Sequence, residues 1–169
     1  MVIRREREGD EAAVDAVTTA AFGAPGGGEP VETRLLRDLR ADPGWIPAFS
    51  LVAGGPDGAV TGHVVCTRGD AGGAPALGLG PISVAPEHQR AGIGSALMHA
   101  VVAAAEASGE RLICLLGDPA YYGRFGFAAA AELGVASPDP AWGAYFQARA
   151  LVADAPRGPF AYAAPFGRL

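Results

Sequence analysis

The stretch "HQRAGIGSALM" at residues 88–98 begins a segment whose apolar pattern predicts a long helix, ending at about Ser108. Two glycines, Gly92 and Gly94, lie in its first turn, although a glycine costs a helix about 1 kcal/mol relative to alanine. No Asp or Glu lies in this turn, and the residue before it is Arg90 rather than a carboxylate. The first amide N–H groups of a helix have no internal partner. We therefore expect an external group to bind these N–H groups.

A strand that leads into an uncapped, glycine-rich helix start is typical of an anion site. The N–H groups point in one direction, the helix dipole adds partial positive charge, and the missing side chains let an anion approach. Arg90 can add a charge-assisted hydrogen bond. The alternative is that the glycines only relieve crowding between helix and sheet. A Walker loop is excluded because no Lys-Ser/Thr pair follows the glycines. The dinucleotide fingerprint fails because Leu97 occupies the place of the third glycine.

Composition limits the class of protein. The chain has 169 residues, of which 50% are hydrophobic and 18% charged, and this predicts one folded domain over residues 1–169. The net charge of −5 argues against a nucleic-acid partner. No export signal or membrane-spanning stretch is evident, so we expect a cytoplasmic protein without a membrane partner. Cys66 and Cys114 lie in predicted strands and are expected to be buried free thiols, and no metal site is predicted.

The order of predicted elements gives the fold class. Asp10 is predicted to cap the first helix, and Pro30 to begin a second helix whose arginines (Arg34, Arg37 and Arg40) face outward, after a flexible glycine-rich break at 23–30. The segments 76–85 and 111–116, separated by the long helix, predict a parallel strand pair with a right-handed crossover. The remaining strands are predicted to be antiparallel, at 2–7, 49–54, 59–68 and twice after residue 126. The result is a mixed α/β fold: a mostly antiparallel central sheet of six to seven strands with about four helices on both faces.

Two motifs carry a family resemblance. "ISVAPEHQRAGIGSALM" (82–98) resembles the acetyl-CoA signature of the GCN5-related N-acetyltransferase (GNAT) family, whose core Gln/Arg-x-x-Gly-x-Gly/Ala is matched by Gln89, Gly92 and Gly94. "YYGRFGF" (121–127) resembles the second signature of that family. The element order agrees from the first strand to about Leu151. The chain is identified as a member of this family, and the resemblance implies the acyl-CoA N-acyltransferase fold.

The resemblance also implies a co-substrate and the residues that bind it. The pyrophosphate of acetyl-CoA would lie on the amides of residues 90–95, and the pantetheine arm would pair with the strand at 82–84. The Gly80–Pro81 pair fits a bulge that opens the sheet there, because proline cannot donate to a ladder. The acetyl carbonyl would receive a backbone N–H near Val84. The implied binding residues are Ile82, Ser83, Val84, Gln89, Arg90, Ala91, Gly92, Ile93, Gly94 and Ser95.

Catalytic roles follow from the same resemblance. Tyr122 occupies the position of the acid that protonates the leaving thiolate, and the alternative is that it is only a packed aromatic residue, the interpretation we favour for Tyr121. Many members carry a glutamate base on the central strand, but "ALGLGPISVA" (76–85) has no acidic residue. Glu32 and His63 remain as candidate bases. His63 is interpreted as a core or surface-strand histidine, and Glu32 can equally be a solvated helix charge.

The acceptor is defined only in outline. In this family it enters between the two N-terminal helices and the last strands. Here that region would draw on Phe22, the stretch "GAPGGGEP" (23–30), Trp45, and "SPDPAWGAYF" (137–146) with Trp142 and Phe146. These residues predict a partly apolar pocket unless the tryptophans belong to the core. This pocket suits a small-molecule amine, with a peptide amine as the alternative. A homodimer is compatible with the sequence, which carries no signal for the oligomeric state. The leading function is an acetyl-CoA-dependent N-acetyltransferase; the alternatives are a non-catalytic acyl-CoA-binding module and a dinucleotide oxidoreductase.

Overall fold

A computed structural model describes residues 1–23 and 26–169, so part of the expected glycine-rich break lies outside the described residues. The helices are α1 (Glu11–Phe22), α2 (Val31–Arg40), α3 (Ile93–Ala107) and α4 (Pro119–Tyr122). The longer strands are β1 (Val2–Arg5), β2 (Ser50–Gly54), β3 (Val60–Ala71), β4 (Ala74–Val84), β5 (Leu112–Leu116) and β8 (Phe146–Ala150). Three short strands follow α4: β6 (Ala128–Ala129), β7 (Val135–Ala136) and β9 (Gly158–Ala161).

The strands form one mixed sheet. Its main order is β1-β2-β3-β4-β5-β8-β6, and β9 pairs with both β3 and β7. The β4–β5 pair is parallel, as the crossover through α3 predicts, and every other pair on the main path is antiparallel. The fold class is thus confirmed. The described residues contain nine strands rather than six or seven, because the segment after α4 forms four strands instead of the two expected, and two of the four have only two residues each.

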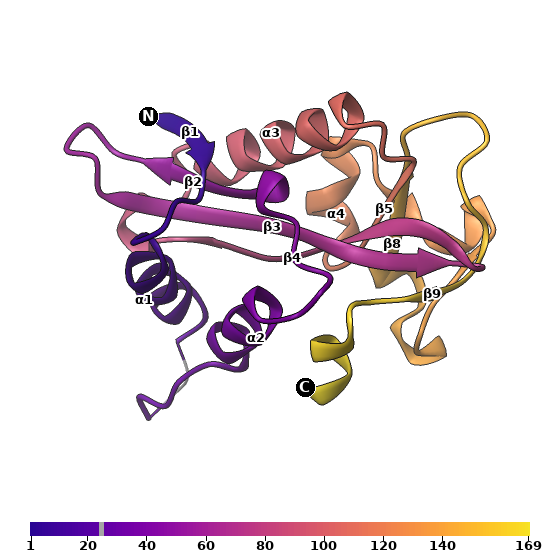
Figure 1. The fold of residues 1–169 in the computed structure, drawn as a ribbon, viewed down its shortest axis with the longest axis horizontal. Coiled ribbons are helices and arrows are strands. Elements are labelled where there is room, and N and C mark those ends of the chain that lie inside the picture. The colour runs from indigo at the N-terminus through magenta and orange to yellow at the C-terminus, as the bar shows by residue number, and fades with distance from the viewer. Residues whose placement is uncertain (24–25) are drawn as a thin grey trace.

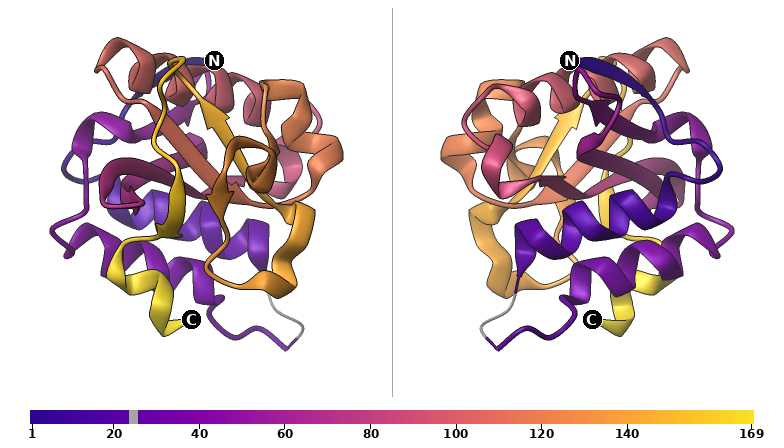
Figure 2. Two further views of the ribbon diagram at one scale, coloured as in Figure 1. Left: turned by 90° about the vertical axis from the view of Figure 1, so that its right-hand side faces the viewer. Right: turned by 90° about the vertical axis from the view of Figure 1, so that its left-hand side faces the viewer.

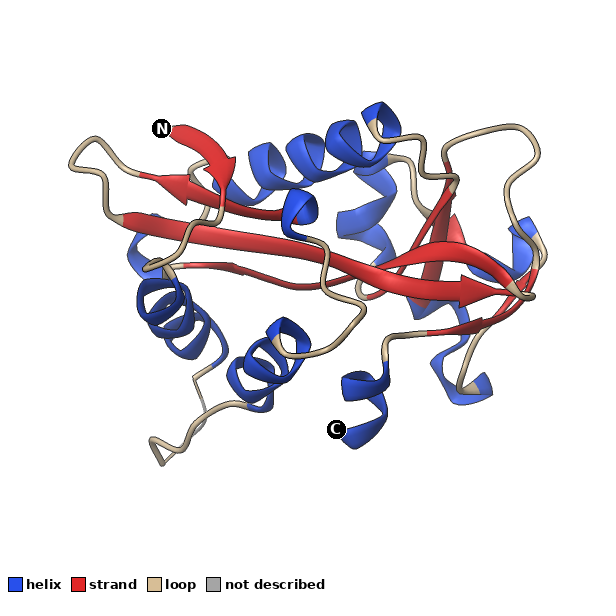
Figure 3. Ribbon diagram, viewed as in Figure 1, coloured by secondary structure: helices blue, strands red, loops and turns tan. Residues whose placement is uncertain are grey.

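Helices cover both faces of the sheet (Figures 1 and 3). On one face, α3 contributes Leu97, Met98 and Val101 to the main hydrophobic core, where they pack against residues of β2 to β5. On the other face, Val14 of α1 and Leu36 of α2 pack against Val52 and Val65 of the sheet. The helical pattern of the opening stretch therefore predicts the buried side of α3 correctly.

Two details at the N-terminal end differ from the prediction. Asp10 does not cap α1: its carboxylate accepts hydrogen bonds from the Arg4 guanidinium at 2.6 and 3.0 Å and from the Arg7 amide. Arg40 does not face outward, because its guanidinium binds Glu6 and Asp15 beneath α1 and is only 16% exposed. In both cases a charged partner from another element outweighs the local preference.

Candidate functional site

The start of α3 has the uncapped geometry that the glycines predict. Gly92 is the N-cap residue with φ +84°, and no side chain accepts a hydrogen bond there. The preceding Arg90 also adopts a left-handed backbone, with φ +61°. Gly94 is constrained in a different way, since a Cβ at this position would lie 2.8 Å from the Tyr121 hydroxyl and the tyrosine would have to shift. The first N–H groups of the helix thus have no side-chain cap, and the Tyr121 hydroxyl lies close to Gly94.

Beside this helix start, the sheet is open between β4 and β5. The two strands pair only at Leu77–Ile113 and Gly78–Cys114, after which β5 continues alongside β8 alone. The expected bulge is present, because the β3–β4 register shifts between Val64 and Cys66, opposite residues 80–81. The edge of β4 from residue 80 to residue 84 thus has no strand partner on the β5 side among the described residues.

A cleft of about 790 Å³ joins the open edge of β4 to the start of α3. We call it the cofactor cleft because it lies where the sequence resemblance places acetyl-CoA. Eight of the ten expected binding residues line it: Ile82, Ser83, Val84, Gln89, Arg90, Gly92, Gly94 and Ser95. Ala91 and Ile93 do not, and the Ile93 side chain packs into the main core instead. The Gln89 side chain donates a hydrogen bond to the Val84 carbonyl at 3.1 Å, so it fixes the loop between β4 and α3.

A larger cleft of about 1070 Å³, which we call the aromatic cleft, lies next to the first. Phe22, Ile82 and Tyr122 line both clefts, so the two spaces meet at these residues. Trp142 and Phe22 line the aromatic cleft as expected. Trp45 and Phe146 do not: Trp45 packs beneath α2, and Phe146 is 1% exposed in a second core with Phe160.

The sequence reasoning missed several residues of the aromatic cleft. Phe160, Tyr162 and Phe166 come from the segment after β8, which returns beside α2 through β9 and a short 3-10 helix, η6 (Ala164–Arg168), as seen in Figure 2. Tyr162 and Phe166 stack with their ring centroids 4.4 Å apart. The resemblance extended only to about Leu151, and no periodic pattern marks this segment. The missed aromatic lining residues are Phe160, Tyr162 and Phe166, whereas Ser137, Pro138, Asp139 and Trp142 belong to the expected stretch 137–146.

Tyr122 lies where the two clefts meet, on α4. Asp118 caps this short helix by accepting the Ala120 N–H at 2.9 Å, as predicted. The half-buried Tyr122 ring is seated on Gly117, where a Cβ would lie 2.9 Å from the ring atom Cδ2 and closer still to Cε2. Burial, with a smaller effect of Tyr121, raises the pKa of the Tyr122 phenol to about 12. The hydroxyl therefore stays protonated at neutral pH.

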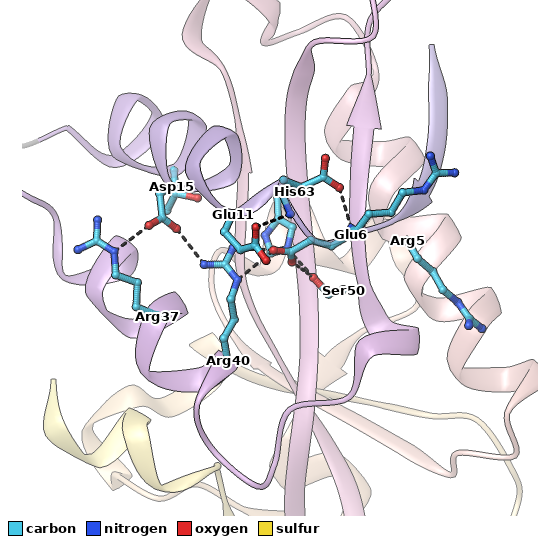
Figure 4. Close-up of polar contacts among 12 residues, drawn as sticks. Arg5, Glu6, Glu11, Asp15, Arg37, Arg40, Ser50 and His63 are labelled. Atoms are coloured by element: carbon cyan, nitrogen blue, oxygen red, sulfur yellow. Dashed lines mark hydrogen bonds and ion pairs between the residues drawn. The ribbon is translucent and has the colours of Figure 1, made fainter.

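The two candidate bases lie in different environments. Glu32 lines the aromatic cleft. His63 is fully buried on the α1/α2 face of β3, where its Nε2 lies 2.8 Å from Ser50 Oγ and 3.2 Å from Glu6 Oε2 (Figure 4). Burial holds the pKa of His63 below its usual value, despite the adjacent Glu6. The interpretation of His63 as a core residue is confirmed, and the side chain lines neither cleft.

The polar cluster around His63 fixes the helices that border the aromatic cleft. Glu6 accepts hydrogen bonds from Ser50 and, at 2.9 Å, from Arg40 Nε, and Arg40 also binds Asp15 of α1 at 3.0 Å (Figure 4). Arg37 extends the cluster to Asp15 at 2.7 Å. These contacts join α1 and α2 to each other and to the sheet. They thereby fix the helix segments that carry Phe22 and Glu32.

Metal and membrane features are absent from the part of the chain that the structure describes. No group of three or more His, Cys, Asp or Glu side chains is placed to hold a metal ion there. Of the helices in residues 1–23 and 26–169, none has the length and apolar character needed to cross a membrane. Cys66 and Cys114 are buried free thiols.

Comparison with known proteins points to one family. A family model described as "Acetyltransferase (GNAT) domain" matches residues 49–129. The chain is 31% identical over 160 residues to the uncharacterized N-acetyltransferase YhbS of Escherichia coli K12, which covers 94% of this chain and 92% of YhbS. The crystal structure of E. coli YhbS in complex with CoA superimposes with a TM-score of 0.90 at 29% identity, covering 99% of this chain and 92% of that one. A GNAT family acetyltransferase from Brucella melitensis, solved with acetyl-CoA, gives 0.79 at 38% identity and covers 98% and 97%. With two signature motifs, the expected fold and relatives of this similarity, the chain belongs to the GNAT family of N-acetyltransferases.

Proposed function

We propose that this protein is an acetyl-CoA-dependent N-acetyltransferase that moves an acetyl group to a primary amine. One observation carries the proposal: the cofactor cleft and the aromatic cleft meet at Tyr122. An extended molecule that starts at α3 and follows the open edge of β4 reaches Ile82, which borders both clefts. The reacting end of such a molecule therefore comes to the mouth of a second space that is large enough for an acceptor.

The chain's own residues fit CoA. The N–H groups of Ile93, Gly94 and Ser95 are the first of α3 and lack helical partners, so they suit a pyrophosphate even though the Ile93 side chain is buried. Arg90 is exposed beside them and supplies a positive charge. The unpaired edge of β4 at residues 82–84 suits the amides of a pantetheine arm, which would bind like an additional strand. The relatives solved with CoA and acetyl-CoA support this assignment.

The proposed reaction is direct attack of the amine on the thioester carbonyl. The new N–C bond forms, the C–S bond breaks, and one proton leaves the amine while another is needed at the sulfur. A lysine-like amine has a pKa of about 10.4, so it must lose a proton before attack. Glu32 is the carboxylate proposed to accept this proton, directly or through water.

Tyr122 is proposed as the general acid that assists departure of the thiolate. A thiol has a pKa of about 8.5, whereas that of the Tyr122 phenol is about 12. Complete proton transfer from Tyr122 to a free thiolate is thus uphill by roughly 5 kcal/mol. We infer that the hydroxyl acts mainly as a hydrogen-bond donor to the sulfur while the C–S bond breaks, and that solvent then restores the proton balance.

The test combines an amine panel with a pair of variants. Thiol release from acetyl-CoA in the presence of primary amines is expected for the wild type. In Tyr122→Phe, which loses one hydrogen-bond donor to the developing negative charge, kcat should fall by about 10²–10³-fold with the KM for acetyl-CoA almost unchanged. Tyr121→Phe is the matched control and should remain near wild type. A folded Tyr122→Phe enzyme with kcat within threefold of wild type would refute the acid role. CoA binding without turnover of any amine would favour the non-catalytic module.

A further inference from the structure

The aromatic cleft has an uneven charge. Its described lining includes the carboxylates Glu32 and Asp139 but no arginine or histidine. Neither carboxylate forms an ion pair with the described residues, whereas Glu6, Asp15 and Glu110 are each paired with arginine. Two carboxylates without a counter-charge beside apolar walls create a negative potential that favours a cation.

The remaining lining is apolar and largely aromatic. Trp142, Tyr162 and Phe166 form adjoining rings, with centroids 6.5 Å apart for Trp142–Tyr162. Two of the large hydrophobic side chains that are exposed in this protein, Phe22 (38%) and Leu116 (45%), also border the cleft. Exposed apolar side chains gathered in one concave space are typical of a binding site for an apolar group.

From this combination we propose that the acceptor is a small monocationic amine attached to an aromatic or similarly bulky apolar body. The inference rests on the proposed function, since it assigns the aromatic cleft to the amine. The ammonium group would be attracted by the two carboxylates and the ring faces, and the apolar body would be buried against the rings. An amine that carries its own carboxylate would be repelled. A polyamine would leave its additional charges against apolar walls, which is costly.

The probes are primary amines that differ in one property each. 2-Phenylethylamine has the proposed chemistry, phenylalanine adds a carboxylate, ethanolamine lacks the apolar body, and a short peptide offers an α-amine with polar amides. We expect kcat/KM for 2-phenylethylamine to exceed that for each of the others by about tenfold or more. Calorimetric titration of the CoA-saturated protein with the same amines gives dissociation constants that do not depend on turnover.

Asp139→Asn tests the charge itself. Asp139 Oδ1 accepts the Ala141 N–H at 2.9 Å, and the Asn side-chain oxygen keeps this hydrogen bond. The variant should reduce the preference for 2-phenylethylamine over phenylalanine by about tenfold, in both binding and turnover. Glu132→Gln is the matched control, because Glu132 is exposed and does not line the cleft; its preference should equal that of wild type.

The outcomes separate this inference from the proposed function. Equal or better binding and turnover of phenylalanine, ethanolamine or the peptide would overturn the inference and leave the acetyltransferase assignment intact. An unchanged preference in Asp139→Asn would also overturn it. So would competition between octanoyl-CoA and 2-phenylethylamine, because it would indicate that the cleft holds an acyl chain instead. Selective binding of 2-phenylethylamine without thiol release would support the cleft's selectivity and refute the proposed function.

Discussion

The contact between Gly117 and the Tyr122 ring allows the position of the tyrosine to be tested without changing its chemistry. In Gly117→Ala, the new Cβ would overlap the ring, since it would lie 2.9 Å from Cδ2 and closer to Cε2. Carbon atoms pack at about 3.5–4.0 Å, so the ring has to move by roughly 1 Å. Gly117 does not have a left-handed backbone, so alanine itself is tolerated there.

The expected size of the effect follows from this displacement. A misplacement of about 1 Å in a catalytic group can cost about 10²-fold in rate, and the loss cannot exceed that of removing the hydroxyl. We expect kcat to fall about 100-fold with KM for acetyl-CoA unchanged, measured as thiol release with an accepted amine. Overpacking should also lower the free energy of unfolding by about 1–3 kcal/mol, measured by urea denaturation.

Two controls make the result interpretable. Gly123 lies one residue beyond α4, and a Cβ there meets no atom within 4 Å, so Gly123→Ala should keep kcat within threefold of wild type. If Gly117→Ala acts through the tyrosine, the double variant with Tyr122→Phe should be no slower than Tyr122→Phe alone. A folded Gly117→Ala enzyme with wild-type kcat, or losses that add in the double variant, would refute the reasoning.

Three further predictions concern charge and thiols. Arg90→Ala removes one charge-assisted contact, worth about 1.5–3 kcal/mol, so the affinity for CoA should fall by roughly one to two decades and depend less on salt concentration. An unchanged salt dependence would mean that the Arg90 side chain lies away from the phosphates. The free energy of unfolding should decrease as the pH falls below about 6.5, because His63 gains a proton in the unfolded chain but resists it when buried. It should decrease further as Asp10 and Glu6 protonate, and the pKa of Asp10 is lowered to about 2 by its hydrogen bond with Arg4. Burial alone would raise the pKa of Glu6, but His63, Ser50 and Arg40 lower it below the usual value, so Glu6 also loses stability on protonation. Equal free energies of unfolding at pH 4 and pH 7, measured by urea denaturation, would contradict this prediction. Burial raises the pKa of Cys66 and Cys114, so a thiol reagent should react slowly with the native protein, whereas two thiols per chain should react after denaturation. Rapid reaction of the native protein would show that the strands open.

The features predicted correctly from sequence are those set by neighbouring residues. The glycines at 92 and 94 and the apolar spacing of α3 specify the open helix start and its buried side, and Asp118–Pro119 specifies the start of α4. The parallel β4–β5 pair follows from one strand–helix–strand unit. All of these depend on periodicity, caps and turns, which can be recognised within one continuous stretch of the chain, the longest being residues 74–116.

The features that were missed depend on partners far along the chain. The sequence pattern predicts that Arg40 faces outward, because it does not reveal the ion pairs of Arg40 with Glu6 and Asp15. Similarly, the Asp10 carboxylate pairs with Arg4 instead of capping the helix. Phe160 and Tyr162 reach the aromatic cleft because β9 returns to pair with β3, which is separated from it by about 90 residues of sequence. No local pattern encodes such a pairing, so the wall of the cleft could not be predicted from the sequence.

The two adjacent tyrosines explain why glycines occur on both sides of the cofactor cleft. The Tyr121 hydroxyl lies where a side chain at Gly94 would begin, and the Tyr122 ring lies where a side chain at Gly117 would begin. Each glycine therefore leaves space for one tyrosine, so α4 can pack against the start of α3 and the end of β5 at the same time. The glycine at position 94 thus leaves room for the Tyr121 hydroxyl beside the cleft, in addition to the anion-binding role that we propose for its backbone N–H. An alanine at Gly94 would contact the Tyr121 hydroxyl first, whereas an alanine at Gly117 would contact the Tyr122 ring first. We therefore expect Gly94→Ala to lower CoA affinity more than kcat, and Gly117→Ala to lower kcat more than CoA affinity.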